Sequence, residues 1–269
     1  MEKQTKIPYQ FFVVTFTWSW LIWLPLFLIG NGIWPLGKDL LASITLPVSI
    51  LAAFGPAAGA IYCLRTFQGK DAVWQYLRGL LDFRFGWRAW LIPILVFGGS
   101  TMFSWVLPEL WGEPRQEMLL PSVWVFLPYL LLMILLGGGQ EEIGWRGYIL
   151  DPLEERLGPW LGNLMLGVVW ALWHLPLFYI PGTSQNFMPF AGFVLLTIGY
   201  SWFYSWVRQS SEKRTMAGLF AHGWANAFVP LFPVVVMVEG ASQPRYWIWV
   251  SLTFLIGLVT MVIRSRKTK

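Results

Sequence analysis

Residues 121–146 read PSVWVFLPYLLLMILLGGGQEEIGWR, an apolar run that ends in three glycines and a charged cluster. The apolar part approaches the length of about 20 residues that a helix needs to span a bilayer. Glu141, Glu142 and Arg146 come directly after it. Ionisable groups at membrane depth are expensive to insert, so a cluster of them beside a membrane span predicts a functional site.

The composition of the whole chain agrees with this interpretation. Hydrophobic residues make up 56% of the 269 residues and charged residues 12%, and the mean hydropathy is +0.55. A soluble domain usually carries about 25% charged residues, so we expect an integral membrane protein. The predicted fold class is all-α, a polytopic membrane helix bundle of about eight transmembrane helices, near residues 10–30, 41–64, 88–108, 121–139, 159–180, 187–207, 215–237 and 246–263.

The placement of basic residues predicts how this bundle is oriented. Lys and Arg collect in cytoplasmic loops, and with the N-terminus inside, all of them fall in predicted inner segments except Lys38, Arg115 and Arg245. Arg146 is counted among the inner residues. The pattern predicts that both termini are cytoplasmic. The net charge of +5 then reflects topology and contact with anionic lipid headgroups. It does not indicate nucleic-acid binding, because no basic face is interleaved with exposed polar surface.

The chain is expected to form a single domain, 1–269, with a motif-bearing core at about 121–237, because no linker or low-complexity block divides it. The first apolar run, Phe11 to Ile29, is too long for a signal-peptide core and has no small-residue cleavage site after it. We interpret it as a retained first helix. Apolar residues recur at helical spacing over 71–82, which predicts an amphipathic helix at the inner interface.

Few residues in this chain are suited to acid–base or metal chemistry. The single cysteine, Cys63, excludes an internal disulfide and a thiolate metal cluster, and is predicted to be a small buried apolar residue. The two histidines both lie in apolar segments: His174 in VVWALWHLPLF and His222 in LFAHGWANAF. Each has a companion four residues away, Trp170 and Asn226 respectively.

The pair His222 and Asn226 permits three interpretations. Four-residue spacing places the imidazole and the carboxamide on one helix face, where two donors can hold a developing oxyanion or two ligands can hold a metal. A purely structural pair that joins neighbouring helices by hydrogen bonds is the third. His174 alone is weaker evidence, because a lone histidine in an apolar helix often bonds a neighbouring helix.

The two acidic residues of the cluster, Glu141 and Glu142, are predicted to have different roles. Glu141 and Glu142 point about 100° apart on a helix, so both cannot face one target. Glu142 and Arg146 share a face, and an ion pair between them is predicted. Glu141 is then free to act as a base that takes a proton from water, or it is a solvated acid at headgroup level. The preceding glycines, 137–139, permit close approach of a backbone or a substrate.

The three clusters together resemble a known family. Glu141-Glu142-x-x-x-Arg146, Trp170-x-x-x-His174 and His222-x-x-x-Asn226 are similar, in order and spacing, to the three motifs of the CPBP intramembrane proteases. That family includes the type II CAAX prenyl endopeptidases and bacteriocin-processing or immunity proteins. The stretch EEIGWRGYIL is especially similar. The family usually has Phe where Trp170 stands, and its pattern accepts Asn or Asp at Asn226.

The resemblance implies eight helices around a conical polar cavity, with peptide hydrolysis as the chemistry. It implies that Glu141 and His174 activate the water. It also implies that His222 and Asn226 stabilise the oxyanion. The expected partners are a peptide or protein substrate, prenylated or not, and the lipid bilayer. The expected location is a prokaryotic plasma membrane.

The remaining motif residues, Glu142, Arg146 and Trp170, are implied to support the site. Whether a metal takes part stays open. Two His, one Glu and one Asn can ligate zinc, yet no HExxH pattern is present, and a metal-free mechanism is preferred. Two other functions also stay open: a non-catalytic immunity or scaffold relative, and a proton-coupled transporter in which Glu141 and both histidines relay protons.

The depths of the polar residues conflict with one another. At 1.5 Å per residue, His222 lies about 10 Å from the inner end of its span and His174 roughly 22 Å, whereas Glu141 falls near the inner surface. A common site therefore requires tilted or offset helices, or a segment carrying Glu141 that dips back into the bundle.

Overall fold

Apolar helices dominate the computed structural model, which describes residues 6–267 and contains no strand in that range. Six stretches are long and apolar enough to cross a membrane. They are Tyr9–Gly30, Asp39–Phe67, Trp87–Trp111, Val123–Tyr179, Phe190–Ser210 and Pro244–Arg266. The predicted all-α, polytopic membrane bundle is confirmed.

The stretch Val123–Tyr179 crosses the bundle twice. Within α8 (Leu150–Trp173), Gly158 has φ 76° and ψ 164°, a left-handed conformation that favours glycine, and Pro159 begins the returning helix. Asn163 Nδ2 donates to Glu154 Oε1 across this turn at 2.7 Å. A further pass comes from α10 (Thr215–Leu231), which has 17 residues. The elements therefore give the eight passes that the hydropathy pattern predicts.

The first two passes pack through small and hydroxyl side chains. The second pass consists of α2 (Lys38–Ala52) and α3 (Gly55–Phe67), which are separate helices. Where they meet, Ser19 Oγ of α1 (Tyr9–Gly30) donates to Ala52 O at 2.7 Å. A Cβ on Gly55 would lie 2.1 Å from Ser19 Oγ, so the helices can approach this closely only because of the glycine. Cys63 of α3 is buried and free, as predicted.

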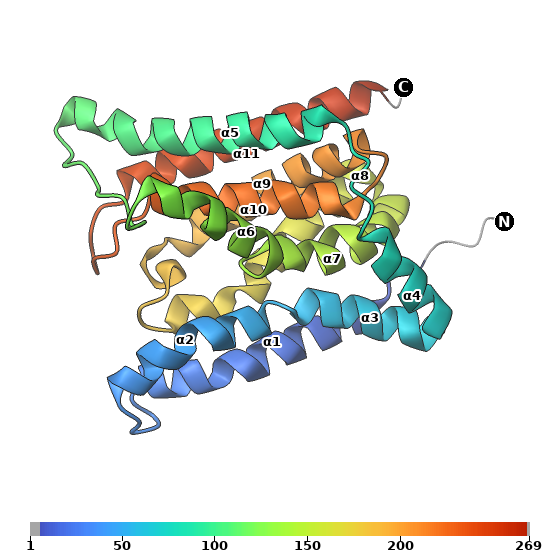
Figure 1. Ribbon diagram of the computed structural model, residues 1–269, viewed down its shortest axis with the longest axis horizontal. Helices are drawn as coiled ribbons and strands as arrows, with labels where there is room; N and C mark the ends of the chain where they lie inside the picture. Colours follow the sequence, from blue (N-terminus) through green and yellow to red (C-terminus); the bar gives the residue numbers. More distant parts are fainter. Residues whose placement is uncertain (1–5, 268–269) are drawn as a thin grey trace.

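Two helices, α9 (Phe190–Ser210) and α10, lie inside the bundle, and α10 carries the motif residues His222 and Asn226. α9 has buried residues on every side and packs against α8, α10 and α11 (Pro244–Lys267). α10 in turn packs between α5 (Trp87–Val106), α6 (Phe126–Leu135) and α9. Figure 1 shows α5 and α11 along one side of the bundle and α1 to α3 along the other. The interior helices are therefore shielded from lipid.

Both ends of the described chain lie at the same end of the bundle, where α1 begins and α11 ends (Figure 1). An even number of passes requires this arrangement, while the assignment of this end to the cytoplasm stays a prediction. The amphipathic helix is α4 (Lys70–Gly79), close to the predicted 71–82, and it lies at this end. Its residue Trp74 is exposed.

The predicted fourth span, 121–139, is wrong at its inner end. α6 stops at Leu135, and after a break the pass resumes with η3 (Gly139–Glu141), α7 (Glu142–Gly144) and the π-turn η4 (Trp145–Ile149), before α8 begins. Non-helical backbone at membrane depth is tolerated where it is buried in protein or lines a cavity. Glu141 therefore lies in the middle of the pass and not at the inner surface.

The same correction applies to Arg146, which was counted with the inner basic residues but is fully buried. Smaller corrections concern two helix ends. The fifth span is helical only to Trp173 and continues as the 3-10 turn η5 (Leu175–Tyr179), and the seventh ends at Leu231 instead of 237. The connection from η5 to α9 includes a second 3-10 turn, η6 (Ser184–Phe187).

Candidate active site

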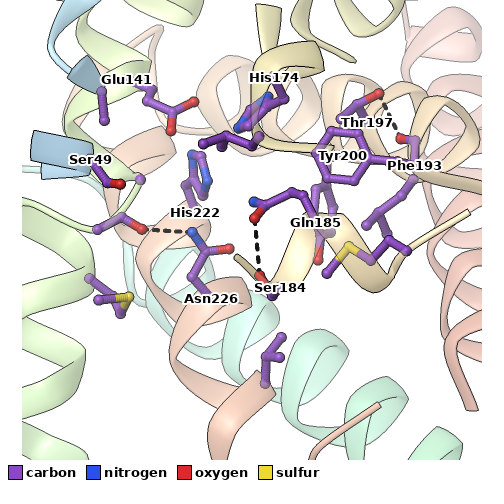
Figure 2. Close-up of a pocket in the computed structure, with 18 of the residues that line it drawn as sticks. Ser49, Glu141, His174, Ser184, Gln185, Phe193, Thr197, Tyr200, His222 and Asn226 are labelled. Atoms are coloured by element: carbon purple, nitrogen blue, oxygen red, sulfur yellow. Dashed lines mark hydrogen bonds between the residues drawn. The ribbon is translucent and has the colours of Figure 1, made fainter. Parts of the chain in front are cut away.

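The four predicted catalytic residues line one cavity of about 400 Å³. Glu141 comes from the break in the fourth pass, His174 from the end of α8, and His222 with Asn226 from α10 (Figure 2). The conflict of depths seen in the sequence is removed, because the fourth pass extends well beyond Glu141 toward the inner end. The break, and not a tilt of whole helices, brings Glu141 to the histidines.

The Glu141 carboxylate is held by the predicted supporting residue Trp170. Trp170 Nε1 donates to Glu141 Oε2 at 2.8 Å, and Glu141 is 5% exposed. The indole is itself buried at the centre of the bundle. A hydrogen bond from a buried aromatic N–H fixes the orientation of the carboxylate, which faces the cavity in Figure 2.

The imidazole of His174 is fixed by its own helix. His174 Nδ1 lies 2.9 Å from Trp170 O. A carbonyl oxygen only accepts hydrogen bonds, so Nδ1 carries the proton of the neutral ring and Nε2 keeps its lone pair. The ring packs edge to face on Trp173 and Phe193, with centroids 4.6 and 5.1 Å away. Packing and hydrogen bonding together select one tautomer and one orientation.

The predicted ion pair between Glu142 and Arg146 is confirmed, and Glu142 also contacts a third residue that the sequence did not indicate. Arg146 Nη1 lies 3.0 Å from Glu142 Oε1, and both side chains are fully buried. The same carboxylate oxygen lies 2.9 Å from His222 Nδ1. The Arg146 guanidinium lies over the rings of Trp170 at 4.7 Å and Tyr204 at 5.1 Å. Glu142, which is held by Arg146, therefore fixes the orientation of the His222 ring through Nδ1.

Asn226 faces the glycine run that precedes the acidic cluster. Its Nδ2 donates to Gly137 O at 2.7 Å. Gly138 has φ 133°, and a Cβ there would lie 2.4 Å from Asn226 Nδ2 and 2.6 Å from His222 Nε2. The predicted close approach at these glycines is thus present at Gly138. One amide hydrogen of Asn226 remains for another acceptor, because the Nδ2 group carries two.

Part of this chain is similar in sequence to known proteins. The family model described as type II CAAX prenyl endopeptidase Rce1-like matches residues 122–228. The match contains all seven residues predicted from the three motifs. This match agrees with the resemblance of the three motifs to the CPBP family. The chain is also 40% identical over 60 residues to CAAX prenyl protease 2 of Methanococcus maripaludis, an alignment that covers 22% of this chain and 22% of that protein.

The zinc hypothesis can be compared with the positions of the donors. Within residues 6–267, no three His, Cys, Asp or Glu side chains converge closely enough to hold a metal ion. Glu141, His174 and His222 line the cavity without forming such a group. The donor set as placed does not fit a metal centre, so the proposed chemistry uses the side chains alone.

Two supporting residues of this site were not identified from the sequence. Gln140 closes the break: its Oε1 accepts from Gly138 N and its Nε2 donates to Leu136 O, both at 2.9 Å. Tyr76 of α4 donates to Ile143 O beside the acidic cluster. Burial raises the pKa of the Tyr76 hydroxyl above its usual value, so it remains a donor. Gln140 adjoins the motif and offered a signal, whereas Tyr76 offered none.

Proposed function

We propose that this chain is an intramembrane endopeptidase that hydrolyses a peptide bond with a water activated by Glu141 and His174. The observation that carries the proposal is the single cavity that joins this carboxylate and imidazole to Asn226 and His222. The family match and the name of the similar Methanococcus maripaludis protein support the same class of activity. The substrate is a CAAX-type prenylated peptide or another small or membrane-bound peptide.

The first step is proton transfer from water. Glu141 takes a proton as the water oxygen attacks the carbonyl carbon, while His174 Nε2 accepts a hydrogen bond from the same water. A tetrahedral oxyanion forms. Glu141 then returns the proton to the amide nitrogen, the carbon–nitrogen bond breaks, and an acid and an amine are released.

Two side chains of α10, Asn226 and His222, stabilise the oxyanion. Asn226 donates its second amide hydrogen, since Gly137 O accepts only one. His222 Nε2 is the second group of α10 proposed at the oxyanion, and the hydrogen bond between His222 Nδ1 and Glu142 Oε1 fixes the orientation of the ring. Glu142 thus contributes to the reaction through His222.

The lining of the cavity indicates the residues that a substrate presents. Among the described lining residues, Glu141 is the only carboxylate and there is no Lys or Arg. The remaining surface is largely aliphatic and aromatic, and it includes Leu196, Tyr200 and Trp249. We therefore infer that neutral, apolar side chains flank the bond that is cleaved, because a charged one would be buried without a partner.

A peptide library separates this proposal from its alternatives. Purified protein in lipid nanodiscs is incubated with prenylated and unprenylated peptides, and products are identified by mass spectrometry. Products that depend on an intact Glu141 establish the enzyme. The broken fourth pass favours a proton-coupled transporter as a second candidate. Proton uptake by proteoliposomes without any cleavage would favour that candidate, and binding without either would favour a scaffold.

We expect Asn226→Ala to lower kcat by about 10²–10³-fold with a modest change in KM, the usual loss for one oxyanion donor. Single-turnover kinetics measure this directly. Elemental analysis of wild type and variant is the matched measurement for metal dependence. Asn226 would instead be a metal ligand if active wild type contained stoichiometric zinc and the variant contained none. In that case chelated wild type would also need zinc to recover its activity.

We expect Gly138→Ala to lower kcat/KM by at least about 100-fold. The added Cβ collides with His222 and Asn226, and the left-handed backbone itself costs about 1–3 kcal/mol for a residue other than glycine. Gly240→Ala is the matched control: φ there is 73°, but no atom lies within 4 Å of the added carbon. Equal losses of activity in the two variants would assign the effect to backbone strain alone.

A further inference from the structure

Gln185 enters the cavity from the wall opposite α10. It belongs to η6, the 3-10 turn between α8 and α9. Figure 2 shows its carboxamide extending into the cavity toward His222 and Asn226, with Tyr200 on its other side. No sequence motif includes Gln185, and the proposed catalytic steps do not use it.

One end of this carboxamide is held and the other is not. Ser184 Oγ donates to Gln185 Oε1 at 3.1 Å. Gln185 Nε2, in contrast, has no hydrogen-bond partner among the described residues. A donor that faces a largely apolar cavity without a partner is unfavourable unless a ligand or water accepts its hydrogen bond. The bond from Ser184 directs the two amide hydrogens toward the cavity.

The turn that carries Gln185 is tied to the preceding one. Thr183 Oγ1 donates to Leu177 O at 2.6 Å, and Asn186 Nδ2 donates to Phe178 O at 2.9 Å. Both acceptors belong to η5, which directly succeeds His174. These bonds fix the position of the Gln185 backbone relative to His174. A residue that contacts the substrate beside the catalytic group needs such a fixed position.

We propose that Gln185 is a substrate-binding residue that donates from Nε2 to one backbone carbonyl of the bound peptide, close to the bond that is cleaved. This inference rests on the proposed endopeptidase function. A peptide between the two walls has its reacting carbonyl at Asn226 and a neighbouring carbonyl on the opposite side. Because the contact is to the backbone, it fixes the register of the peptide and not the identity of a side chain.

Two substitutions at Gln185 test the donor. Gln185→Met keeps the length of the side chain and removes the donor, and we expect kcat/KM to fall about 5–30-fold, mainly through KM. Gln185→Glu presents only acceptors when ionised and should lose more. Asn186→Ala is the control for damage to the turn, and it should lower kcat/KM less than Gln185→Met. Melting temperatures confirm that each variant is folded.

Modified peptides give the decisive measurement. Each backbone amide near the cleaved bond is replaced in turn by an alkene, which removes one carbonyl. At the contacted position the alkene should lower the activity of wild type, but it should not lower the activity of Gln185→Met any further. At every other position the alkene should lower the activity of both proteins by the same factor. The same factor for both proteins at every position, or a Gln185→Met variant within twofold of wild type, would overturn the inference. Absence of cleavage by wild type would instead overturn the proposed function.

Discussion

Glu141→Gln is expected to abolish peptide hydrolysis while expression and thermal stability stay nearly unchanged. The amide has the shape of the carboxylate and can still accept the hydrogen bond from Trp170 through its oxygen. It cannot take a proton from water, so the attacking nucleophile is not formed. Turnover of a cleaved peptide, measured under single-turnover conditions for both proteins, gives the ratio directly.

The control for this substitution is the same chemical change at an exposed position. Glu117 lies exposed in the loop between α5 and α6, and Glu117→Gln should leave turnover unchanged. If Glu141→Gln retains turnover within about tenfold of wild type, Glu141 is not the base. A general base typically contributes about 10²–10⁴-fold, so the two outcomes are well separated.

Arg146→Ala should reduce both the amount of folded protein and the activity. The substitution leaves the Glu142 carboxylate buried without its cation, and breaking a buried ion pair from one side costs about 3–5 kcal/mol. The stacking of the guanidinium on Trp170 and Tyr204 is lost as well. Thermal melting in detergent and the yield of monodisperse protein measure the effect.

Two comparisons isolate the cause of that loss. Adding Glu142→Gln to Arg146→Ala removes the unpaired charge and should restore part of the stability but not the activity. Arg115→Ala breaks a pair with Glu109 at 2.7 Å, but Arg115 is 62% exposed. That change should have little effect on stability, because solvent screens an exposed pair. Normal melting and normal activity of Arg146→Ala would show that the buried pair does not support the site.

Hydropathy and charge were sufficient to predict the bundle, because each pass must be an apolar helix whose backbone satisfies its own hydrogen bonds. The spacing of the motifs was sufficient to predict the Glu142–Arg146 pair, since four residues along a helix place two side chains on one face. His222 as the second partner of Glu142 could not be predicted. That contact joins residues 80 positions apart and depends on how α10 packs.

The depth of Glu141 is the clearest failure of the sequence interpretation. A polar cluster after an apolar run indicates the end of a span, and hydropathy does not distinguish such an end from a break that lines a cavity. Here residues 142–150 continue the pass, and all of them are buried or half-buried in the bundle. Gln185 could not be predicted for another reason, because it lies in a connection without periodicity, and only tertiary structure shows where it points.

The broken fourth pass also has a consequence for biogenesis. Ionised side chains at the centre of a helix cost about 2.5–3.5 kcal/mol each during insertion, so this segment enters the bilayer poorly by itself. The residues that stabilise it, Trp170, Tyr204 and His222, are all synthesised later. A nascent chain that stops before α10 lacks His222 and Asn226 altogether. The cavity therefore gains its complete set of polar residues only after α10 has been synthesised.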